Sequence, residues 1–491
     1  MKTVGWPTAV IAVLTIAVLA VRCFGVVLDF HDAVFYPFEI DYGEGIVWQQ
    51  AASFMVGAAY RPLTAFPFIV FHYPPVYYGV VWLFSWAFAD LLAAGRAVSV
   101  CASLCIAASV AMTVWGFGTS QRRMWRAAVA AVAALTVLGS GNVWTWGLLM
   151  RVDMVAIALS FLGLLVAHRS NGRFGWLVVA LVLCTAAVYT KQVQVSAGSA
   201  IFATALLLRT KPALSAGAIA GLVGLSAFLV LQMQTGGGFF QNIVLANINP
   251  FSWSYLELVV WEERRDLAIL VVGLGAAIVC VARIGPVHSL RRRMRADSLV
   301  ASRVLATLHY GACGLTLVTA AKEGSNVNYF IEFLVSGVVL AGFAAFDAIQ
   351  AGRPRWLNYG LVALGLGTTL MPWRGMPAYA LVHDSAAQWA LVDQLRTLPA
   401  PVSSENMTLL MRAGQPVVYE PAIVRHLALT GSWDEQPLLD MIRARRFAVM
   451  ITIDPALRFT SLRTPAADAA MRESYPVVTV DAPGLWVHRP Q

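Results

Sequence analysis

The chain has 491 residues, of which 59% are hydrophobic and only 12% are charged. Soluble domains carry about 25% charged residues, so this composition excludes an ordinary soluble protein and indicates a membrane protein with many spans. The net charge of +9 comes from short basic clusters between apolar runs, a pattern that is typical of membrane topology and argues against nucleic-acid binding.

The first apolar run resembles a signal peptide, because Lys2 precedes the apolar residues 10–21. Arg22 stands directly before Cys23, which argues against a lipoprotein cleavage site, and no A-x-A signal follows. We therefore expect a retained first span.

Apolar stretches of spanning length, roughly 17–25 residues, recur over the first three quarters of the chain. The expected spans are 5–28, 97–118, 127–148, 152–168, 174–190, 192–208, 213–233, 267–283, 299–320, 329–349 and 357–372. The apolar interval 75–92 is ambiguous, but the basic clusters between spans all face the cytoplasm only if it does not cross. We expect an interfacial helix there, started by Pro74-Pro75, and hence eleven spans with the N-terminus inside and the C-terminus outside.

Two long loops, 29–74 and 234–266, fall on the outer side in this topology, and loops of such length are usually functional or mobile. From about residue 376 the composition becomes that of a soluble domain. Expected helices at 383–398 and 434–446 alternate with expected strands at 417–419, 447–453 and 476–480. The fold class is therefore mainly α, with a transmembrane domain over 1–375 and a small extracytoplasmic α/β domain over 376–491.

The first outer loop carries an acidic cluster at residues 39–45 (EIDYGEG). Carboxylates at a membrane face are costly to keep, so they indicate a functional site. Asp41 or Glu44 could act as general base toward an acceptor hydroxyl. The alternative is a helix start, in which Asp41 caps the helix and Glu44 completes a capping box.

Two basic positions at the outer ends of spans are further candidates. Arg151 and Asp153 could bind a phosphate and orient a hydroxyl or a metal, or they could be a helix cap with a snorkelling arginine. Lys191 lies in a very short turn between spans, where it could reach an anionic headgroup or simply snorkel.

The segment 322–332 is dense in polar groups where a span should begin. Glu332 lies within the apolar run and shares a helix face with Asn328, so its carboxylate needs a partner, for which Lys322 is the plain alternative to a ligand. The segment 72–78 is aromatic and proline-rich, as in an interfacial belt, and His72 could still touch substrate. The candidate site residues are Asp41, Glu44, His72, Tyr73, Arg151, Asp153, Lys191, Lys322, Glu323, Asn326, Asn328 and Glu332.

The six cysteines show no metal-type spacing, so we expect neither a disulfide framework nor a zinc site. A divalent metal shared by Asp41 and Asp153 stays open, because the neighbouring acids that would make it a strong site are missing.

The order of these features resembles the GT-C glycosyltransferases: one span, a long outer loop with an acidic motif, an interfacial helix, then an Arg/Asp pair before the fourth span. The bacterial branch of aminoarabinose transferases, protein O-mannosyltransferases and polyprenyl-phosphate-mannose-dependent enzymes is the most similar, over about 1–375. The stretches 324–332 and 404–417 are also similar to members of that superfamily.

The resemblance implies a bacterial inner-membrane transferase that moves a sugar from a polyprenyl-phosphate donor to an extracytoplasmic glycan, lipid or protein. Asp41 stands where the family has its first-loop catalytic aspartate. Family motifs often pair Asp and Glu directly, whereas Tyr-Gly separates Asp41 from Glu44 here, so the choice of base between them stays open.

The residues agree with this chemistry. A lipid-phosphate leaving group needs positive charge rather than a proton, and Arg151, Lys191 and Lys322 could supply it. A base on the opposite face of the sugar predicts inversion. The rival class is a transporter or lipid flippase, but we find no internal repeat and no charges at the middle of spans. A third interpretation is an assembly protein with a degenerate site.

Overall fold

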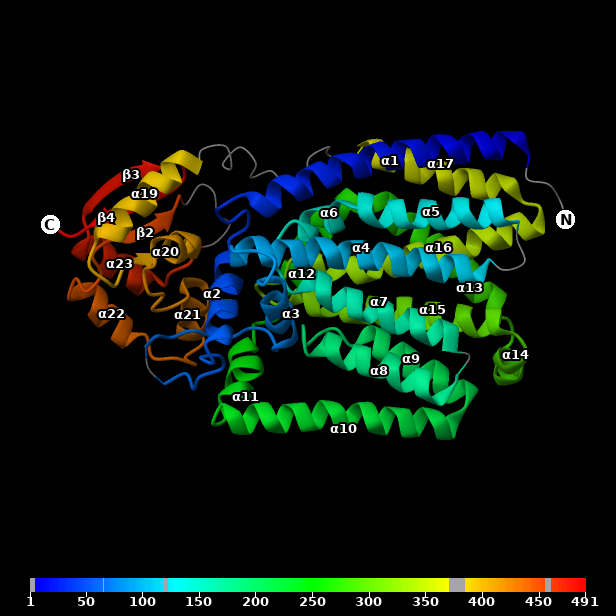
Figure 1. Ribbon diagram of the computed structural model, residues 1–491, viewed down its shortest axis with the longest axis horizontal. Coiled ribbons are helices and arrows are strands. Elements are labelled where there is room, and N and C mark those ends of the chain that lie inside the picture. The colour runs from blue at the N-terminus through cyan, green and yellow to red at the C-terminus, as the bar shows by residue number, and fades with distance from the viewer. Residues whose placement is uncertain (1–4, 65, 119–121, 171, 371–384, 455–460) are drawn as a thin grey trace.

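The computed structural model describes residues 5–370 and 385–491, with gaps at 65, 119–121, 171 and 455–460. Long helices run side by side as a bundle, and a smaller mixed domain caps one end of it (Figure 1). The N-terminus lies at the far end of the bundle from this cap.

The bundle consists of long apolar helices. They are α1 (Trp6–Phe35), α4 (Leu91–Phe117), α5 (Arg123–Gly139), α6 (Gly141–Gly147), α7 (Asp153–Ser170), α8 (Phe174–Val188), α9 (Ser196–Leu208), α10 (Thr210–Gln234), α13 (Leu267–Ile284), α15 (Ser298–Thr316), α16 (Phe330–Ala351) and α17 (Pro354–Leu370). In lipid, the backbone must satisfy its own polar groups, and helices do this within one segment. Seven described helical stretches are long and apolar enough to cross a membrane, or eight if the bent pair α5–α6 is one span. The chain is thus a multi-pass membrane protein, but the count of eleven spans is not confirmed.

The interval 75–92 does not contain a spanning helix. Its helix α3 (Val76–Phe84) has nine residues, so it is roughly 14 Å long against a hydrocarbon core of about 30 Å. Trp82, Leu83 and Trp86 on and after this helix are exposed, as suits a segment at the membrane interface. The next span, α4, begins at Leu91, where the Asp90 side chain caps the helix by accepting from the Leu92 N–H.

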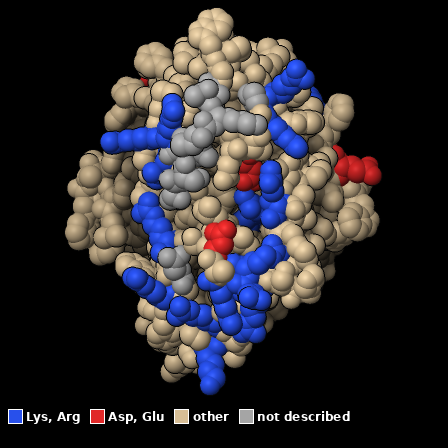
Figure 2. Space-filling model, turned by 90° about the vertical axis from the view of Figure 1, so that its right-hand side faces the viewer, with Lys and Arg blue, Asp and Glu red and all other residues tan. Residues whose placement is uncertain are grey.

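Basic side chains gather at the end of the bundle away from the cap, as Figure 2 shows. The last turns of α7, α13 and α14 (Leu290–Ala296) bring Arg169, Arg283 and Arg293 to this end. Under the positive-inside rule this is the face expected in the cytoplasm.

The other end carries the loops, which are built of short helices. These are α2 (Gly43–Met55), α11 (Gly238–Ile243), η1 (Leu245–Asn247), α12 (Trp253–Glu262), η2 (Glu263–Asp266), η4 (Leu317–Ala321) and η5 (Val327–Tyr329), while η3 (Val287–Ser289) lies at the opposite end. The buried Asp266 holds the second loop to the bundle, since its carboxylate accepts from Ser140 Oγ at 3.0 Å and from the Gly141 and Asn142 N–H groups at 2.9 Å, at the start of α6.

The cap is a small α/β domain, as predicted. Its elements are α19 (Ser385–Thr397), β1 (Ser403–Ser404), α20 (Met407–Ala413), α21 (Pro421–Leu429), α22 (Gln436–Arg443), β2 (Met450–Ile453), α23 (Pro465–Ser474), β3 (Val477–Ala482) and β4 (Leu485–Arg489). The strands form one sheet of order β1-β2-β4-β3, in which β1 and β2 are parallel and the other two pairs are antiparallel.

The strand expected at 417–419 is not part of this sheet. Tyr419 instead forms an isolated parallel bridge with Phe68 in the first outer loop, where the Phe68 N–H donates to the Val418 carbonyl at 2.7 Å. Phe68 also shares a buried hydrophobic cluster with Tyr419, Ile423 and Trp433. The first outer loop therefore supplies part of the hydrophobic core of the cap.

Candidate functional site

Asp41 lies just before α2, at the end of the bundle that the cap covers. Its Oδ2 atom is 2.8 Å from Arg151 Nη2, and it accepts a long hydrogen bond of 3.3 Å from the Gly43 N–H. The Asp41 side chain is 37% exposed, so part of its carboxylate faces solvent. A substrate hydroxyl can reach this group.

Gly43 makes the contact between Asp41 and Arg151 possible. A Cβ atom at position 43 would lie 1.7 Å from Arg151 Nη1, so any side chain would displace the guanidinium. The other side of the Arg151 guanidinium faces the ring of Trp146, 5.3 Å from the ring centroid. Burial acts to lower the pKa of Arg151, but the carboxylates of Asp41 and Asp153 and the Tyr73 phenol outweigh it, and the pKa is raised. Arg151 is therefore a firmly charged cation between the two carboxylates.

Asp153 begins α7 and is buried in a second ion pair. Lys191 Nζ lies 2.6 Å from its Oδ1, and the Asn328 amide donates to the same oxygen at 2.8 Å. The ammonium also lies 4.2 Å from the ring centroid of Tyr329. Burial acts to lower the pKa of Lys191, but Asp153 outweighs it and the pKa is raised, so the ammonium stays charged.

Tyr73 joins these two pairs. Burial raises the pKa of its phenol, and the charges of Arg151, Asp153 and Lys191 all act on it. The structure thus brings together six predicted residues from five separate segments, which we call the outer cluster: Asp41, Tyr73, Arg151, Asp153, Lys191 and Asn328.

Glu44 lies three residues after Asp41, but its carboxylate is buried and has different partners. It forms a fully buried ion pair with Arg96, in which Arg96 Nε and Nη2 donate to its two oxygens at 2.8 and 2.7 Å. Its carboxylate also accepts from the backbone N–H groups of Ile40 and Met150, both at 2.7 Å. Both oxygens are engaged, so Glu44 has no free position for a substrate hydroxyl.

The hydrogen-bonding capacity of Arg96 is also fully used. Its remaining N–H groups donate to the carbonyl oxygens of Ala33, Tyr36 and Phe38 at 2.6–2.7 Å. All five donors of the guanidinium are used. This buried pair therefore fixes the end of α1, the start of α2 and the loop that carries Asp41.

The remaining candidates lie apart from the outer cluster. His72 faces the cap, with Nε2 3.6 Å from Glu420 Oε2. Lys322, Glu323 and Asn326 belong to the loop between η4 and η5. Its contacts include backbone pairing with Phe251 and Pro250, a hydrogen bond from the Asn249 amide to the Glu323 carbonyl at 2.8 Å, and a cap by Asn326 on the Val327 N–H.

Glu332 lies in the first turn of α16. Its Oε1 atom is 3.0 Å from His309 Nε2, so its partner is His309. The expected alternative, a pairing with Lys322, is wrong, because two helices bring together residues that are 23 positions apart.

Several site residues were not predicted. Tyr42 and Glu420 link the acidic loop to the cap, since the Tyr42 hydroxyl donates to Glu420 Oε1 at 2.9 Å. Burial, with Glu44 and Asp41 nearby, raises the pKa of Glu39 well above its usual range, and this side chain thus favours its neutral form beside Asp41. A basic residue at the start of an apolar span was the available signal for Arg96.

The outer cluster does not fit the metal that Asp41 and Asp153 were considered able to share. Arg151 already balances Asp41, while Lys191 and Asn328 occupy Asp153. Hard divalent cations prefer several free oxygen ligands, which these residues do not present.

A large apolar pocket lies elsewhere, between α1, α5, α13, α16 and α17. It has a volume of about 660 Å³ and an almost wholly apolar lining, with Arg283, Asp347 and Arg353 on its border. It is suited to hydrocarbon and contains none of the predicted site residues.

No protein-family model and no curated protein sequence matches the chain. Among solved structures, the chain is similar to ArnT from Cupriavidus metallidurans in the apo state, with a TM-score of 0.59, 13% identity, and coverage of 96% of this chain and 97% of that one. The same protein bound to undecaprenyl phosphate gives a TM-score of 0.59 at 12% identity, with the same coverage.

The chain is also similar to the archaeal oligosaccharyltransferase AglB from Archaeoglobus fulgidus in complex with an inhibitory peptide and a dolichol-phosphate. The TM-score is 0.51 at 10% identity, and the match covers 89% of this chain and 69% of that one. At these identities the likeness shows a shared fold over nearly the whole chain.

Proposed function

We propose that this chain, which has the fold of the GT-C glycosyltransferases, is itself an inverting glycosyltransferase. It moves a hexose or pentose from a polyprenyl-phosphate donor to an acceptor hydroxyl. The two structural neighbours that were solved with polyprenyl phosphates, undecaprenyl phosphate in ArnT and dolichol-phosphate in AglB, support a donor of this class.

The observation that carries the proposal is a partly exposed carboxylate, Asp41, paired with the cation Arg151, while a second cation, Lys191, is paired with Asp153 two residues after Arg151. Asp41 can offer an oxygen to the acceptor because its side chain is 37% exposed, while the Arg151 and Lys191 side chains are 18% and 8% exposed. A carboxylate alone indicates many chemistries. A carboxylate next to fixed positive charge suits a reaction in which a hydroxyl loses a proton as a phosphate departs.

In the reaction, the acceptor oxygen attacks the anomeric carbon and its proton passes to Asp41. The bond between that carbon and the phosphate oxygen breaks, and the electron pair leaves with the polyprenyl phosphate. Arg151 and Lys191 balance the charge that this oxygen gains, and the Tyr73 hydroxyl can donate to the same group. Attack from the face opposite the phosphate inverts the anomeric centre.

Glu44 acts as a positioning residue in this scheme. Its pair with Arg96 holds the loop of Asp41 and the backbone at Met150, directly before Arg151. The buried Glu44 carboxylate thereby fixes the positions of both the base, Asp41, and the phosphate-binding cation, Arg151. A role of Lys322, Glu323 and Asn326 in binding substrate stays a prediction, since these residues lie apart from the outer cluster.

We further propose that residues 1–375 form the catalytic membrane domain and 376–491 an extracytoplasmic domain, in a bacterial inner membrane. The basic face at the far end of the bundle supports this orientation (Figure 2). A cysteine introduced at Arg123 should be shielded from a membrane-impermeant thiol reagent in intact cells, and one at Glu323 should be labelled. The reverse pattern would contradict the orientation.

The decisive experiment follows the release of free polyprenyl phosphate by mass spectrometry. Purified protein is incubated with a panel of polyprenyl-phosphate monosaccharides and cell-envelope extract as the source of acceptor. Release from one donor should be lost in Asp41→Asn and retained in Asp32→Asn, which changes an exposed carboxylate on α1. Release that persists in Asp41→Asn, or the absence of release from every donor, would contradict the proposal.

A further inference from the structure

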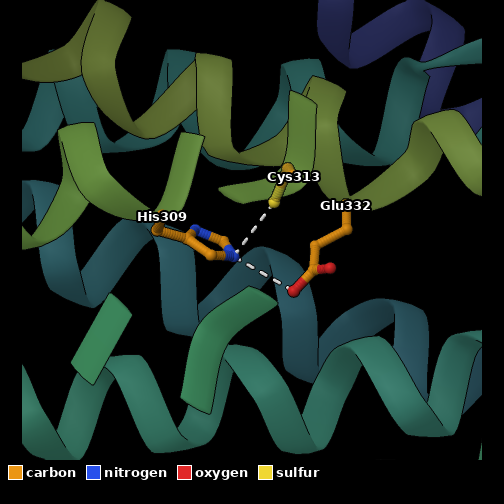
Figure 3. A group of neighbouring side chains, drawn as sticks. All are labelled: His309, Cys313 and Glu332. Atoms are coloured by element: carbon orange, nitrogen blue, oxygen red, sulfur yellow. Dashed lines mark hydrogen bonds and ion pairs between the residues drawn. The ribbon is translucent and has the colours of Figure 1, made fainter. Parts of the chain in front are cut away.

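Three buried side chains meet between α15 and α16, away from the outer cluster (Figure 3). His309 and Cys313 lie one helical turn apart on α15, and Glu332 comes from the first turn of α16. His309 Nε2 is 3.0 Å from Glu332 Oε1 and 3.3 Å from Cys313 Sγ. Within the part of the chain that the structure describes, no other group of three His, Cys, Asp or Glu side chains brings its donor atoms within 4.8 Å of one another.

The donor set is one that transition metals prefer. Imidazole nitrogen, thiolate sulfur and carboxylate oxygen are the three ligand types of protein zinc sites. In a tetrahedral site with bonds of about 2.0–2.3 Å, neighbouring donor atoms lie roughly 3.3–3.6 Å apart. The observed 3.0 and 3.3 Å need only a small expansion to admit an ion.

Charge also favours an ion at this position. A Zn²⁺ held by one thiolate, one carboxylate and one neutral imidazole has no net charge, so the loaded site suits the interior of a membrane bundle. Without an ion, the buried Glu332 carboxylate depends on its pair with His309, and buried ion pairs stabilise little because both groups lose their water.

The two contacts of His309 converge on a single atom. Figure 3 shows both dashed lines ending at the same ring nitrogen. That nitrogen carries either a proton or a lone pair, so it can donate to Glu332 or accept from Cys313 but not both. A metal ion satisfies all three donors at once. His309 also lines a small cavity of about 20 Å³.

We propose that His309, Cys313 and Glu332 bind one Zn²⁺ ion that ties α15 to α16. On binding, Zn²⁺ displaces the proton of the Cys313 thiol, which goes to solvent, and a Zn–S bond forms. Glu332 lies one turn after Asn328, which contacts Asp153, so the ion fixes the helix start that supports the outer cluster. The expectation of no zinc site rested on the spacing of the cysteines. Such spacing can reveal only sites with two or more cysteine ligands, whereas this site has one.

The test is the metal content of the full chain, purified in detergent without chelator and washed. Elemental mass spectrometry should find close to one zinc ion per chain. Cys313→Ser and Glu332→Gln should reduce zinc to background. The matched control is Cys280→Ser, which changes another buried cysteine, on α13, and should retain the ion.

Replacing zinc with Co²⁺ gives a second measurement that does not depend on variants that fold. The wild-type protein should gain the near-ultraviolet absorption of a cobalt–thiolate bond, and Cys280→Ser should gain it too. Wild-type protein that neither retains nor takes up one equivalent of zinc, or a cobalt form without this absorption, would overturn the proposal. Equal zinc in wild type and Cys313→Ser would show an adventitious ion only. None of these measurements requires turnover, so they stand or fall separately from the transferase activity.

Discussion

Replacement of Glu44 by glutamine should destabilise the protein rather than remove only a catalytic group. Glu44 accepts five hydrogen bonds: two from Arg96 and three from the backbone N–H groups of Ile40, Asp41 and Met150. Glutamine keeps one acceptor oxygen and places an NH₂ group where the other oxygen accepted. Donors then face donors in a space where neither partner has any exposed surface.

The magnitude follows from this burial. Removing one partner of a buried ion pair destabilises by about 3–5 kcal/mol, because the other charge stays buried without compensation. Asp41 is a contrasting case, since its side chain is 37% exposed and its pair with Arg151 resembles a surface ion pair, worth about 1 kcal/mol or less. Asp41→Asn should therefore stop turnover with nearly unchanged stability.

The assay pairs thermal unfolding of purified protein in detergent with turnover per folded molecule. Glu44→Gln should lower the apparent melting temperature by several degrees and reduce the yield of folded protein, whereas Asp41→Asn should melt close to wild type. If Glu44→Gln melts like wild type but is inactive, and Asp41→Asn still turns over, the assignment of a structural role to Glu44 is wrong. Glu44 would then be the base.

Three further outcomes are expected. Gly43→Ala should lower kcat about 10²-fold by displacing the Arg151 guanidinium, while Gly79→Ala, whose added Cβ would meet no atom within 4 Å, should be neutral in the same turnover assay. Lys191→Ala should raise the KM for the polyprenyl-phosphate sugar about 10- to 100-fold, as expected for a lost charge-assisted contact, and should also lower the melting temperature because the buried Asp153 loses its cation. An unchanged KM of the folded protein would exclude this lysine from donor binding. Burial lowers the pKa of His488 in the cap from its usual value near 6.5 to about 4. Between these two pH values the imidazole is protonated in the unfolded chain but neutral in the folded chain. Stability should fall as the pH falls through this window, and His488→Gln should weaken that dependence in melting curves taken between about pH 7 and 4.

The membrane architecture could be predicted because length and composition decide it locally. A run of about 20 apolar residues spans wherever it occurs, and α3 is recognisable as an exception from the side on which the basic clusters must fall. Arg151 and Lys191 could be singled out as candidates because they lie at the end of the spans opposite the basic clusters, where the positive-inside rule does not account for a cation.

The partners of these residues could not be predicted from the chain. Asp41 and Glu44 look equivalent in sequence, yet Arg96, 52 positions after Glu44, gives one of them a structural role. For Glu332 the sequence left open a ligand or a pairing with Lys322 in its own segment, and the packing of two helices gives it His309 instead. In both cases the deciding contact joins separate helices, and periodicity carries no information about it.

The bond between Tyr42 and Glu420 also has a consequence for how the protein is made. These residues are 378 positions apart, so the ribosome adds Glu420 roughly 20 to 75 s after Tyr42 at about 5–20 residues per second. Until then the loop of Asp41 lacks its contacts with α20 and α21. The contact between this loop and the cap therefore forms only after the last fifth of the chain has begun to appear. A nascent chain in the membrane, with most of its spans already inserted, would lack this contact between the acidic loop and the cap until the late segment arrives.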